Sequence, residues 1–263
     1  MNFVERKYNS LVRYVYWHYF SKKLNLFQIV EYPKSGGTWM TQLISKYLDT
    51  YYPRNVVPKF KHAVIHGHYK YSDSFNKIVY VVRDGRDIMV SYYFHYVIGN
   101  SRINPNVTKK NRDKLPFEDY DNIKQNLPLF IEYLYTDYLK GFNKFSWSQL
   151  NEDYYRHKDK ICIVRYEDML TNTALELEKA LIFLGETSID NNKLEDTVNA
   201  YNFKNQTKRK PGEEDKNSFL RKGVSGDWKN HFTKEAAIMF DKYAGQNLID
   251  LGYEKDRSWI DKL

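Results

Sequence analysis

Four short apolar runs, rich in β-branched residues, constrain the fold of this chain more than any other feature. They are FQIVEY at 27–32, HAVIHG at 62–67, NKIVYVVR at 76–83 and ICIVRY at 161–166. Continuous apolar runs of this length are typical of strands that are buried on both faces of a parallel sheet. The sequence therefore predicts a central, mainly parallel sheet that is covered on both sides.

Segments with helical periodicity lie between and after these runs. From Trp39 onwards, apolar residues recur at three- and four-residue spacing along one side of a helix. Further helices are predicted over 126–147, 170–184 and 233–249. Alternating strands and helices indicate an α/β fold in which helices flank the sheet. No Pro/Gly/Ser-rich linker divides the chain, so a single domain over 1–263 is predicted.

Composition narrows the class of protein. With 42% hydrophobic and 17% aromatic residues, the chain is globular and not disordered. The N-terminal stretch MNFVERKYNSLVRYVYWHYFSKK lacks the apolar core of a signal peptide, and no run approaches the length of a membrane span. A single cysteine, Cys162, can form no intramolecular disulfide and suits a reducing compartment. We therefore expect a cytoplasmic protein without a membrane partner.

The charge balance favours an anionic ligand without identifying it. The chain has 41 basic and 33 acidic residues, a formal net charge of +8. It contains no zinc-finger spacing, no RNP-like aromatic motif and no basic heptad region, so no nucleic-acid partner is predicted. No Cys/His/Asp cluster has metal-ligand spacing along the sequence, so no metal is predicted either.

The turn between the first apolar run and the Trp39 helix has the composition of an anion-binding loop. It reads PKSGGT at 33–38. Its glycines can adopt backbone angles closed to other residues, so that successive N–H groups converge on one anion. The helix N-terminus adds further donors, and Lys34 adds a positive charge. An ordinary strand-to-helix loop is the alternative. In a Walker A loop the lysine follows the glycines, whereas here it precedes them, which disfavours an ATP or GTP hydrolase.

Four blocks of the sequence resemble the cytosolic-type sulfotransferase family. YPKSGGTW at 32–39 is similar to its 5′-phosphosulfate loop, and VYVVRDGRDIMVSYYFHY at 79–96 to its 3′-phosphate segment. VRYEDM at 164–169 matches another family block, and RKGVSGDWKNHFT at 221–233 resembles the C-terminal signature. The resemblance implies a sheet like that of P-loop nucleotide kinases. It also implies a metal-independent enzyme that moves a sulfonate from 3′-phosphoadenosine 5′-phosphosulfate (PAPS) to a hydroxyl or amine of a small-molecule acceptor, releasing adenosine 3′,5′-bisphosphate (PAP).

The resemblance further implies which residues bind the donor. They are Lys34, Ser35, Gly36, Gly37, Thr38, Trp39, Arg83, Ser91, Tyr166, Phe203, Arg221, Lys222 and Gly223. The loop would hold the phosphosulfate, and Arg83, Ser91 and the 221–223 run would hold the 3′-phosphate. Arginine suits a phosphate because its planar fork bonds two oxygens at once. The aromatic side chains would contact the adenine. For Arg83 the alternative is an ion pair with Asp84 or Asp87, and each aromatic could instead belong to the core.

Sulfonate transfer needs a base for the acceptor proton and a cation for the charge that grows on the leaving oxygen. Lys34 fits the cation. In the family the base is the histidine of a Lys-x-His pattern at the end of the second strand, where this chain reads His66-Gly67-His68. That register favours His68, with His66 as the alternative. In the family the hydroxyl that corresponds to Ser91 can also hold the lysine away from the bridging oxygen until the acceptor arrives.

The chain departs from the family pattern at several positions. Gly37 replaces a threonine of the loop, which predicts weaker donor binding, and His66 stands where the family usually has lysine. Tyr201 falls where a nucleoside-contacting threonine is usual. The family's dimer motif would fall on Lys229, Thr233, Lys234 and Ile238, with two of its positions altered. Both a monomer and a homodimer therefore stay open.

Two other functions stay open on the sequence. A carbohydrate or glycolipid sulfotransferase would use the same donor, and the polar segment 99–125, a predicted acceptor flap, suits such an acceptor. A nucleotide-binding or nucleic-acid-binding protein that has lost catalysis would keep both phosphate sites but would tolerate loss of His68. The segment 202–227 is predicted to be a second mobile segment, a lid over the donor. The identity of the acceptor does not follow from the sequence, because loop shape selects it.

Overall fold

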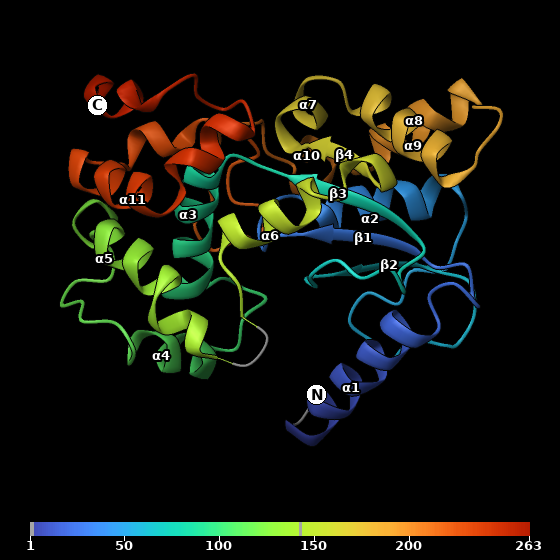
Figure 1. Cartoon of the computed structure of the whole chain (residues 1–263), viewed down its shortest axis with the longest axis horizontal. Helices are drawn as coiled ribbons and strands as arrows, with labels where there is room; N and C mark the ends of the chain where they lie inside the picture. The colour runs from blue at the N-terminus through green and yellow to red at the C-terminus, as the bar shows by residue number, and fades with distance from the viewer. Residues whose placement is uncertain (1–2, 142–143) are drawn as a thin grey trace. The chain divides into compact units, whose positions relative to one another are not determined.

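The computed structural model describes residues 3–141 and 144–263 (Figure 1). The chain forms two compact units that interleave along the sequence. The first unit runs up to Val82 and then takes Asp153–Gln206, and the second consists of Arg83–Glu152 and Thr207–Leu263. All four strands found in the described residues belong to the first unit.

The sheet is fully parallel, in the order β2-β1-β3-β4. Its strands are β1 (Phe27–Glu31), β2 (Val64–Gly67), β3 (Lys77–Val82) and β4 (Cys162–Arg165). Each strand falls within one of the four predicted apolar runs. In the register, Ile29 of β1 lies opposite His66 of β2 and Val79 of β3. The predicted α/β fold with a central parallel sheet is therefore confirmed, whereas a single domain over 1–263 stays a prediction.

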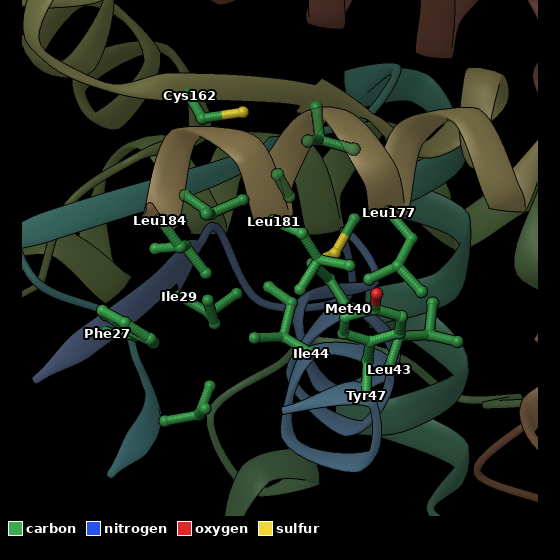
Figure 2. Packing of buried hydrophobic residues seen from close by; sticks show 14 of the residues in the cluster. Phe27, Ile29, Met40, Leu43, Ile44, Tyr47, Cys162, Leu177, Leu181 and Leu184 are labelled. Carbon is green, nitrogen blue, oxygen red and sulfur yellow. The ribbon is translucent and has the colours of Figure 1, made fainter. Parts of the chain in front are cut away.

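One face of the sheet is covered by the helices α2 (Gly37–Tyr47) and α8 (Thr173–Leu184), with α9 (Asn191–Tyr201) packed against both helices. Ile29 of β1 points into this layer together with Leu43 of α2 and Leu181 of α8 (Figure 2). Val79 of β3 belongs to the same cluster, and each of these four side chains is fully buried. Burying an aliphatic side chain of this size stabilises a fold by about 1.5–3 kcal/mol. This layer holds the end of β1 and the start of α2 in fixed positions.

Aromatic and polar side chains cover the opposite face. Gln28 of β1 donates to the carbonyl oxygen of Trp17 in α1 (Phe3–Tyr19) at 3.3 Å. Tyr80 of β3 stacks on Tyr154 at 4.3 Å between ring centroids, and the Tyr154 hydroxyl donates to the Tyr69 carbonyl oxygen. Sequence analysis did not predict α1, because its apolar residues are interrupted by charges.

Helices make up the regular structure described in the second unit. They are α3 (Gly85–Tyr93), the π-helix η1 (Phe94–Ile98), α4 (Pro105–Arg112), α5 (Ile123–Tyr135), η2 (Asp137–Lys140), η4 (Asp227–Asn230), α11 (Lys234–Asp250) and η5 (Arg257–Lys262). Helix α11 packs against α5 and also contacts α3. The unit boundary falls within α6 (Trp147–Tyr155), and the first unit also contains η3 (Lys158–Lys160), α7 (Tyr166–Thr171) and most of α10 (Phe203–Thr207).

Three of the predicted helices are confirmed, and one is wrong in its extent. Helix α2 accounts for the helix from Trp39 and α11 for 233–249, and α8 accounts for most of 170–184, where it follows α7 after a break at Asn172. The helix predicted over 126–147 instead begins at Ile123, after the N-cap Asn122, and ends at Tyr135. It ends there because Thr136 has φ −127° and ψ −90°, which are not helical angles. Two residues of the predicted range, 142–143, lie outside the described residues.

Cys162 is buried in β4. Burial raises the pKa of the Cys162 thiol to about 11, so this thiol stays protonated and unreactive at neutral pH. Among the helices of residues 3–141 and 144–263, every one is too short or too polar to cross a membrane.

The α8 layer yields a stability prediction. Leu181 is fully buried, whereas Leu175 on the same helix is 54% exposed. We expect Leu181→Ala to lower the free energy of unfolding by about 2–5 kcal/mol, because it leaves a cavity in the core. Leu175→Ala is the matched control and should change stability by less than about 0.5 kcal/mol. Urea unfolding measures both, and equal losses would contradict the packing described here.

Candidate functional site

The anion loop, which is the predicted anion-binding loop of residues 33–38, lies in the first unit, leads from β1 into the first turn of α2 and has a constrained backbone. Lys34 has φ +80° and Gly36 has φ +102°, both in the left-handed region. For a non-glycine residue this conformation costs about 1–2 kcal/mol, and such strain clusters at functional sites. A Cβ on Gly36 would lie 2.6 Å from the Tyr166 ring. Position 36 therefore requires glycine both for its backbone angle and for this close approach.

A carboxylate that sequence analysis did not single out, Glu31, anchors this loop. Glu31 is the last residue of β1 and is only 4% exposed. Its Oε2 accepts the N–H of Gly37, the first residue of α2, and its Oε1 lies 2.9 Å from Nε2 of His66. One buried side chain therefore ties the strand end, the helix start and the neighbouring strand together. The one feature of the sequence that pointed to this role is a charged residue at the end of a buried apolar run.

Glu31 also explains why the loop has glycine where the family has threonine. A Cβ on Gly37 would come within 2.8 Å of the Glu31 carboxyl carbon and 3.0 Å of His66 Nε2. Real Cβ atoms essentially never approach other heavy atoms this closely. The departures from the family pattern at Gly37 and His66 are therefore coupled through Glu31.

The site keeps Glu31 ionised despite its burial. Burial alone raises the pKa of this carboxyl. The hydrogen bond and charge of His66, the charge of His68 and the Gly37 amide outweigh burial and hold the pKa below its usual value. The N-terminus of α2 favours the same negative charge. A buried carboxylate therefore sits beside the loop that is predicted to bind an anion.

The two candidate bases differ in their surroundings. Nδ1 of His68 lies 2.9 Å from the carbonyl oxygen of Glu31. Because a carbonyl oxygen only accepts, Nδ1 of His68 carries a hydrogen, and in neutral His68 the lone pair is on Nε2. His66 is half-buried with its Nε2 against the Glu31 carboxylate, whereas His68 is exposed. These contacts suit His68 better than His66 for taking a proton from a substrate.

Glu31, His66 and His68 also form a set of possible metal ligands. Each offers one ligand atom, and the three atoms lie within 4.8 Å of one another. Within residues 3–141 and 144–263 this is the one such set of three or more His, Cys, Asp or Glu residues. Spacing along the sequence missed it because Glu31 and His66 come together only through the pairing of β1 with β2.

The first unit also contains the aromatic residues predicted to contact adenine. The rings of Trp39 and Tyr166 meet edge to face, with centroids 6.2 Å apart, and Phe203 opens α10 half-buried. Among the described residues, the buried Ser35 hydroxyl and Trp39 Nε1 have no hydrogen-bond partner. Buried polar atoms usually have partners, so two orphans at this loop are consistent with a site built for a polar ligand.

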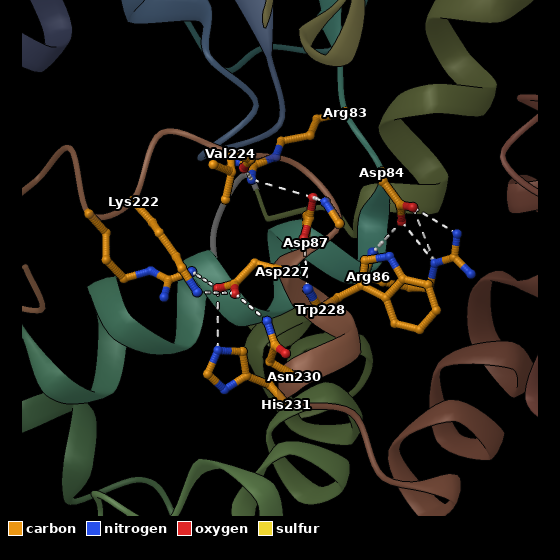
Figure 3. A network of polar contacts seen from close by, with 12 residues as sticks. Arg83, Asp84, Arg86, Asp87, Lys222, Val224, Asp227, Trp228, Asn230 and His231 are labelled. Atoms are coloured by element: carbon orange, nitrogen blue, oxygen red, sulfur yellow. Dashed lines mark hydrogen bonds and ion pairs between the residues drawn. The ribbon is translucent and has the colours of Figure 1, made fainter. Parts of the chain in front are cut away.

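The second unit holds Arg83, which lies just before α3, and Ser91, which lies in α3. Arg83 is buried, and its Nη2 lies 3.6 Å from Asp87 Oδ2 and donates to the Val224 carbonyl oxygen at 3.3 Å (Figure 3). The alternative role of Arg83, an ion pair with a neighbouring aspartate, is therefore observed in part, with Asp87. Asp87 in turn accepts the N–H groups of Gly226 and Trp228, so it fixes the 224–228 turn beside Arg83.

Arg221 and Lys222 are both held by Asp227. Arg221 Nη2 lies 2.6 Å from Asp227 Oδ2. Lys222 Nζ lies 2.5 Å from Asp227 Oδ1 (Figure 3). Asn230 and His231 also contact this carboxylate. Burial alone raises the pKa of Asp227, but the hydrogen bonds from these four side chains reverse the effect and hold its pKa well below the usual range. The predicted phosphate-binding cations thus have a shared counter-ion.

The predicted acceptor flap lines a cavity in the second unit. The segment 99–125 contributes Val107, Asn111 and Lys114 to a cavity of about 520 Å³, which is otherwise rich in tyrosine. Helix α4 within the segment has no buried residue and has Lys109, Lys110 and Arg112 in its last turn. The flap therefore presents a polar, basic surface together with an aromatic hollow.

The family profile described as the sulfotransferase domain matches residues 61–252. Sulfotransferase 2A1 of Homo sapiens is 29% identical over 187 residues, which cover 68% of this chain and 58% of the relative. Sulfotransferase 1A1 of Rattus norvegicus is 24% identical over 276 residues, 86% of this chain and 85% of the relative. The chain thus spans less than two thirds of the human 2A1 relative, and 63% of human Sulfotransferase 2B1.

Solved structures share the fold. Mouse sulfotransferase SULT7A1 complexed with PAP aligns with a TM-score of 0.60 at 23% identity, over 84% of this chain and 83% of that one. Retinol dehydratase in a complex with retinol and PAP aligns with a TM-score of 0.55 at 17% identity, over 86% and 81%. At these identities the likeness concerns the fold, and it confirms the architecture predicted from the sequence blocks.

The contact between Gly37 and Glu31 can be tested by a double-mutant cycle. Gly37 has no positive φ, so Gly37→Ala tests only the collision of its Cβ with Glu31 and His66. We expect this variant to lose about 1–3 kcal/mol of stability, as overpacked sites do. In a Glu31→Ala background the loss should be smaller, with a coupling energy above about 0.5 kcal/mol by urea unfolding.

A matched control is Gly85→Ala, whose Cβ would lie 2.6 Å from the Phe240 ring and touches no part of Glu31. Its cost should be the same with and without Glu31→Ala. Additive losses for Gly37→Ala and Glu31→Ala would contradict the coupling.

The lowered pKa of Asp227 predicts how stability depends on pH. Because the folded-state pKa lies below the unfolded value of about 3.9, the stabilisation is complete above that value and is lost as pH falls below it. We expect Asp227→Asn to lose about 2 kcal/mol at pH 7, the scale of hydrogen bonds to a charged group. The difference from wild type should shrink progressively below pH of about 4. Chemical unfolding at several pH values measures it, and a difference that grows in acid would contradict the assignment.

Proposed function

The chain belongs to the sulfotransferase domain family, and on this premise we propose that it transfers a sulfonate from PAPS to a hydroxyl or amine of a small-molecule acceptor. The main support for the proposal is the arrangement of residues in the first unit. There a strained lysine-glycine loop opens α2, and the Nδ1 hydrogen of His68 is directed at a backbone carbonyl oxygen. The two solved relatives that share the fold are described as bound to PAP, the product of such a donor.

We propose that the loop binds the phosphosulfate end of the donor. Lys34 supplies the charge, and Ser35, Gly36 and Thr38 supply hydroxyl and amide donors. The Gly37 amide already donates to Glu31, so the loop offers the donor one amide fewer. Weaker donor binding, predicted from the missing threonine hydroxyl, follows from this contact as well. The adenine is assigned to Trp39, Tyr166 and Phe203, of which the first two meet edge to face.

We propose that the second unit binds the 3′-phosphate through Arg83, Ser91 and the run Arg221, Lys222 and Gly223. A guanidinium has five N–H donors, so Arg221 can contact Asp227 and a phosphate at the same time. In this scheme Asp227 positions Arg221 and Lys222 and limits the conformational entropy that they lose on binding. Asp87 has the corresponding role for Arg83, at 3.6 Å.

The proposed transfer is an in-line displacement at sulfur. The acceptor oxygen or nitrogen forms a bond to sulfur while the bond from sulfur to the bridging phosphate oxygen breaks. The acceptor proton passes to Nε2 of His68, whose other nitrogen faces the Glu31 carbonyl oxygen. Lys34 neutralises the negative charge that grows on the bridging oxygen. Sulfonated acceptor and PAP leave the site.

The scheme assigns no step to a metal, because Lys34 takes the role that Mg²⁺ has in nucleotide kinases. We propose a small-molecule acceptor and neither a nucleic-acid nor a membrane partner. A cytoplasmic location is proposed from the single, buried, protonated cysteine. Both a monomer and a homodimer are compatible with the dimer-motif positions, of which Thr233 caps α11 through Ala236 N and Ile238 is exposed.

A second candidate acceptor class is a carbohydrate or glycolipid. The polar, basic surface of α4 favours it, because hydroxyl-rich acceptors need many hydrogen-bond donors and few apolar contacts. Screening phenols, sterols, amines and glycans with radiolabelled PAPS would separate the two classes.

Donor binding is tested by thermal stability with PAP, with 5′-AMP and ATP as controls. At about one hundred times its dissociation constant, a ligand adds roughly 2.7 kcal/mol to the folded state. We expect this shift for PAP and much smaller shifts for the controls. Lys222→Ala should reduce it, whereas Lys216→Ala, an exposed lysine on the same segment, should not.

Equal shifts with ATP, or no shift at all, would contradict the proposal. Catalysis is tested separately by His68→Gln, which should keep the PAP shift and lower kcat by at least about 100-fold, the usual contribution of a general base. A chain that binds PAP but sulfonates no acceptor in the screen would instead support the binding protein without catalysis.

A further inference from the structure

We propose that Glu31, His66 and His68 form a binding site for a late transition-metal dication, Zn²⁺ foremost, at the end of β1 and β2. Two imidazoles and one carboxylate are a ligand set that Zn²⁺ accepts readily, with further positions left for water. Their three ligand atoms already lie within 4.8 Å of one another. The family's catalytic scheme does not use such a site.

The contacts around His68 and Glu31 are those that zinc ligands make. A metal-bound histidine generally donates its other ring N–H to a carbonyl or carboxylate oxygen, which fixes the ring and its tautomer. Nδ1 of His68 has this contact, 2.9 Å from the Glu31 carbonyl oxygen, which leaves Nε2 as the nitrogen that can bind a metal. Ligating carboxylates are themselves hydrogen-bonded, and Oε2 of Glu31 accepts the Gly37 N–H.

Charge and burial also favour a dication here. Glu31 is 4% exposed, and its carboxylate is the one formal negative charge of the trio. Two neutral imidazoles leave the site with one net negative charge, which a dication neutralises at short range in a region of low dielectric. His66 is half-buried and His68 is exposed, so an ion can enter from the His68 side.

Binding requires only small movements. Ligand atoms about 2.0–2.2 Å from a tetrahedral zinc are about 3.3 Å apart. The Glu31 and His66 atoms, now 2.9 Å apart, therefore separate slightly when the ion replaces the proton between them. His68 has to approach, and its side chain is the exposed one. The missing Cβ of Gly37 matters here, since a side chain at that position would fill the space beside both Glu31 and His66.

Binding of a metal ion at this site would affect catalysis, and this consequence rests on the proposed function. A metal on Nε2 of His68 occupies the lone pair that would take the acceptor proton. Zn²⁺ should therefore act as a reversible inhibitor that lowers kcat and leaves PAP binding intact.

The site is tested by isothermal titration of the chelator-treated protein with Zn²⁺ and by the visible d–d absorption of bound Co²⁺. We expect one ion per chain, with the strong absorption of a four-coordinate cobalt site. His68→Gln, at an exposed position, and His66→Gln should each weaken Zn²⁺ binding by at least about 100-fold, since loss of a mere supporting hydrogen bond costs 10–100-fold.

The matched control is His62→Gln. His62 is an exposed histidine just before β2, with Nδ1 against the Asn25 carbonyl oxygen at 2.6 Å, and its loss should leave Zn²⁺ binding unchanged. Circular dichroism checks that each variant is folded. No Zn²⁺ binding by the wild type, or equal binding by His68→Gln and His62→Gln, would overturn the proposal. Calorimetry needs no turnover, so failure of the metal site and failure of the sulfotransferase reaction are told apart.

Discussion

The buried carboxylate of Glu31 organises the candidate site of the first unit. It accepts the first amide of α2, pairs with His66 on β2, and offers its own carbonyl oxygen to His68. An ionised carboxylate is costly to bury unless compensating donors surround it, and these contacts supply such donors. The anion loop, the two histidines and Gly37 therefore depend on one side chain, and a change at any of them changes the surroundings of the others.

In the second unit, two aspartates hold clustered charged side chains in place in a similar way. Asp227 brings Arg221 and Lys222 together, and Asp87 fixes the turn beside Arg83. Clustered cations repel one another when no anion is bound, so a shared counter-ion keeps them in place. If these side chains bind the 3′-phosphate as we propose, the phosphate meets ordered side chains but has to share them with a carboxylate. The aspartates therefore order the cationic side chains before binding but lower the affinity of these side chains for the phosphate.

Much of the fold could be predicted from the sequence, because buried parallel strands are continuous apolar runs that leave a direct signal. All four runs contain the strands observed. The helix over 126–147 was predicted too long, since periodicity does not record the non-helical angles of Thr136. The role of Glu31 could not be predicted, because it contacts His66 across a strand pairing of residues 35 positions apart. Motifs give residue types in order, whereas a hydrogen-bonded cluster depends on register.

The departures of this chain from the family loop are best understood together. A threonine at position 37 would add a hydroxyl donor but would collide with Glu31 and His66. Glycine removes the collision and leaves a carboxylate beside a loop that is proposed to receive an anionic donor. The Glu31 carboxylate and an anionic donor would repel each other, so the negative charge of Glu31 has to be offset by nearby groups. The Gly37 amide and the His66 hydrogen bond do this in part. A lysine at position 66 would have supplied a fixed positive charge, whereas a histidine offers a nitrogen that can bind, as we propose, a metal ion.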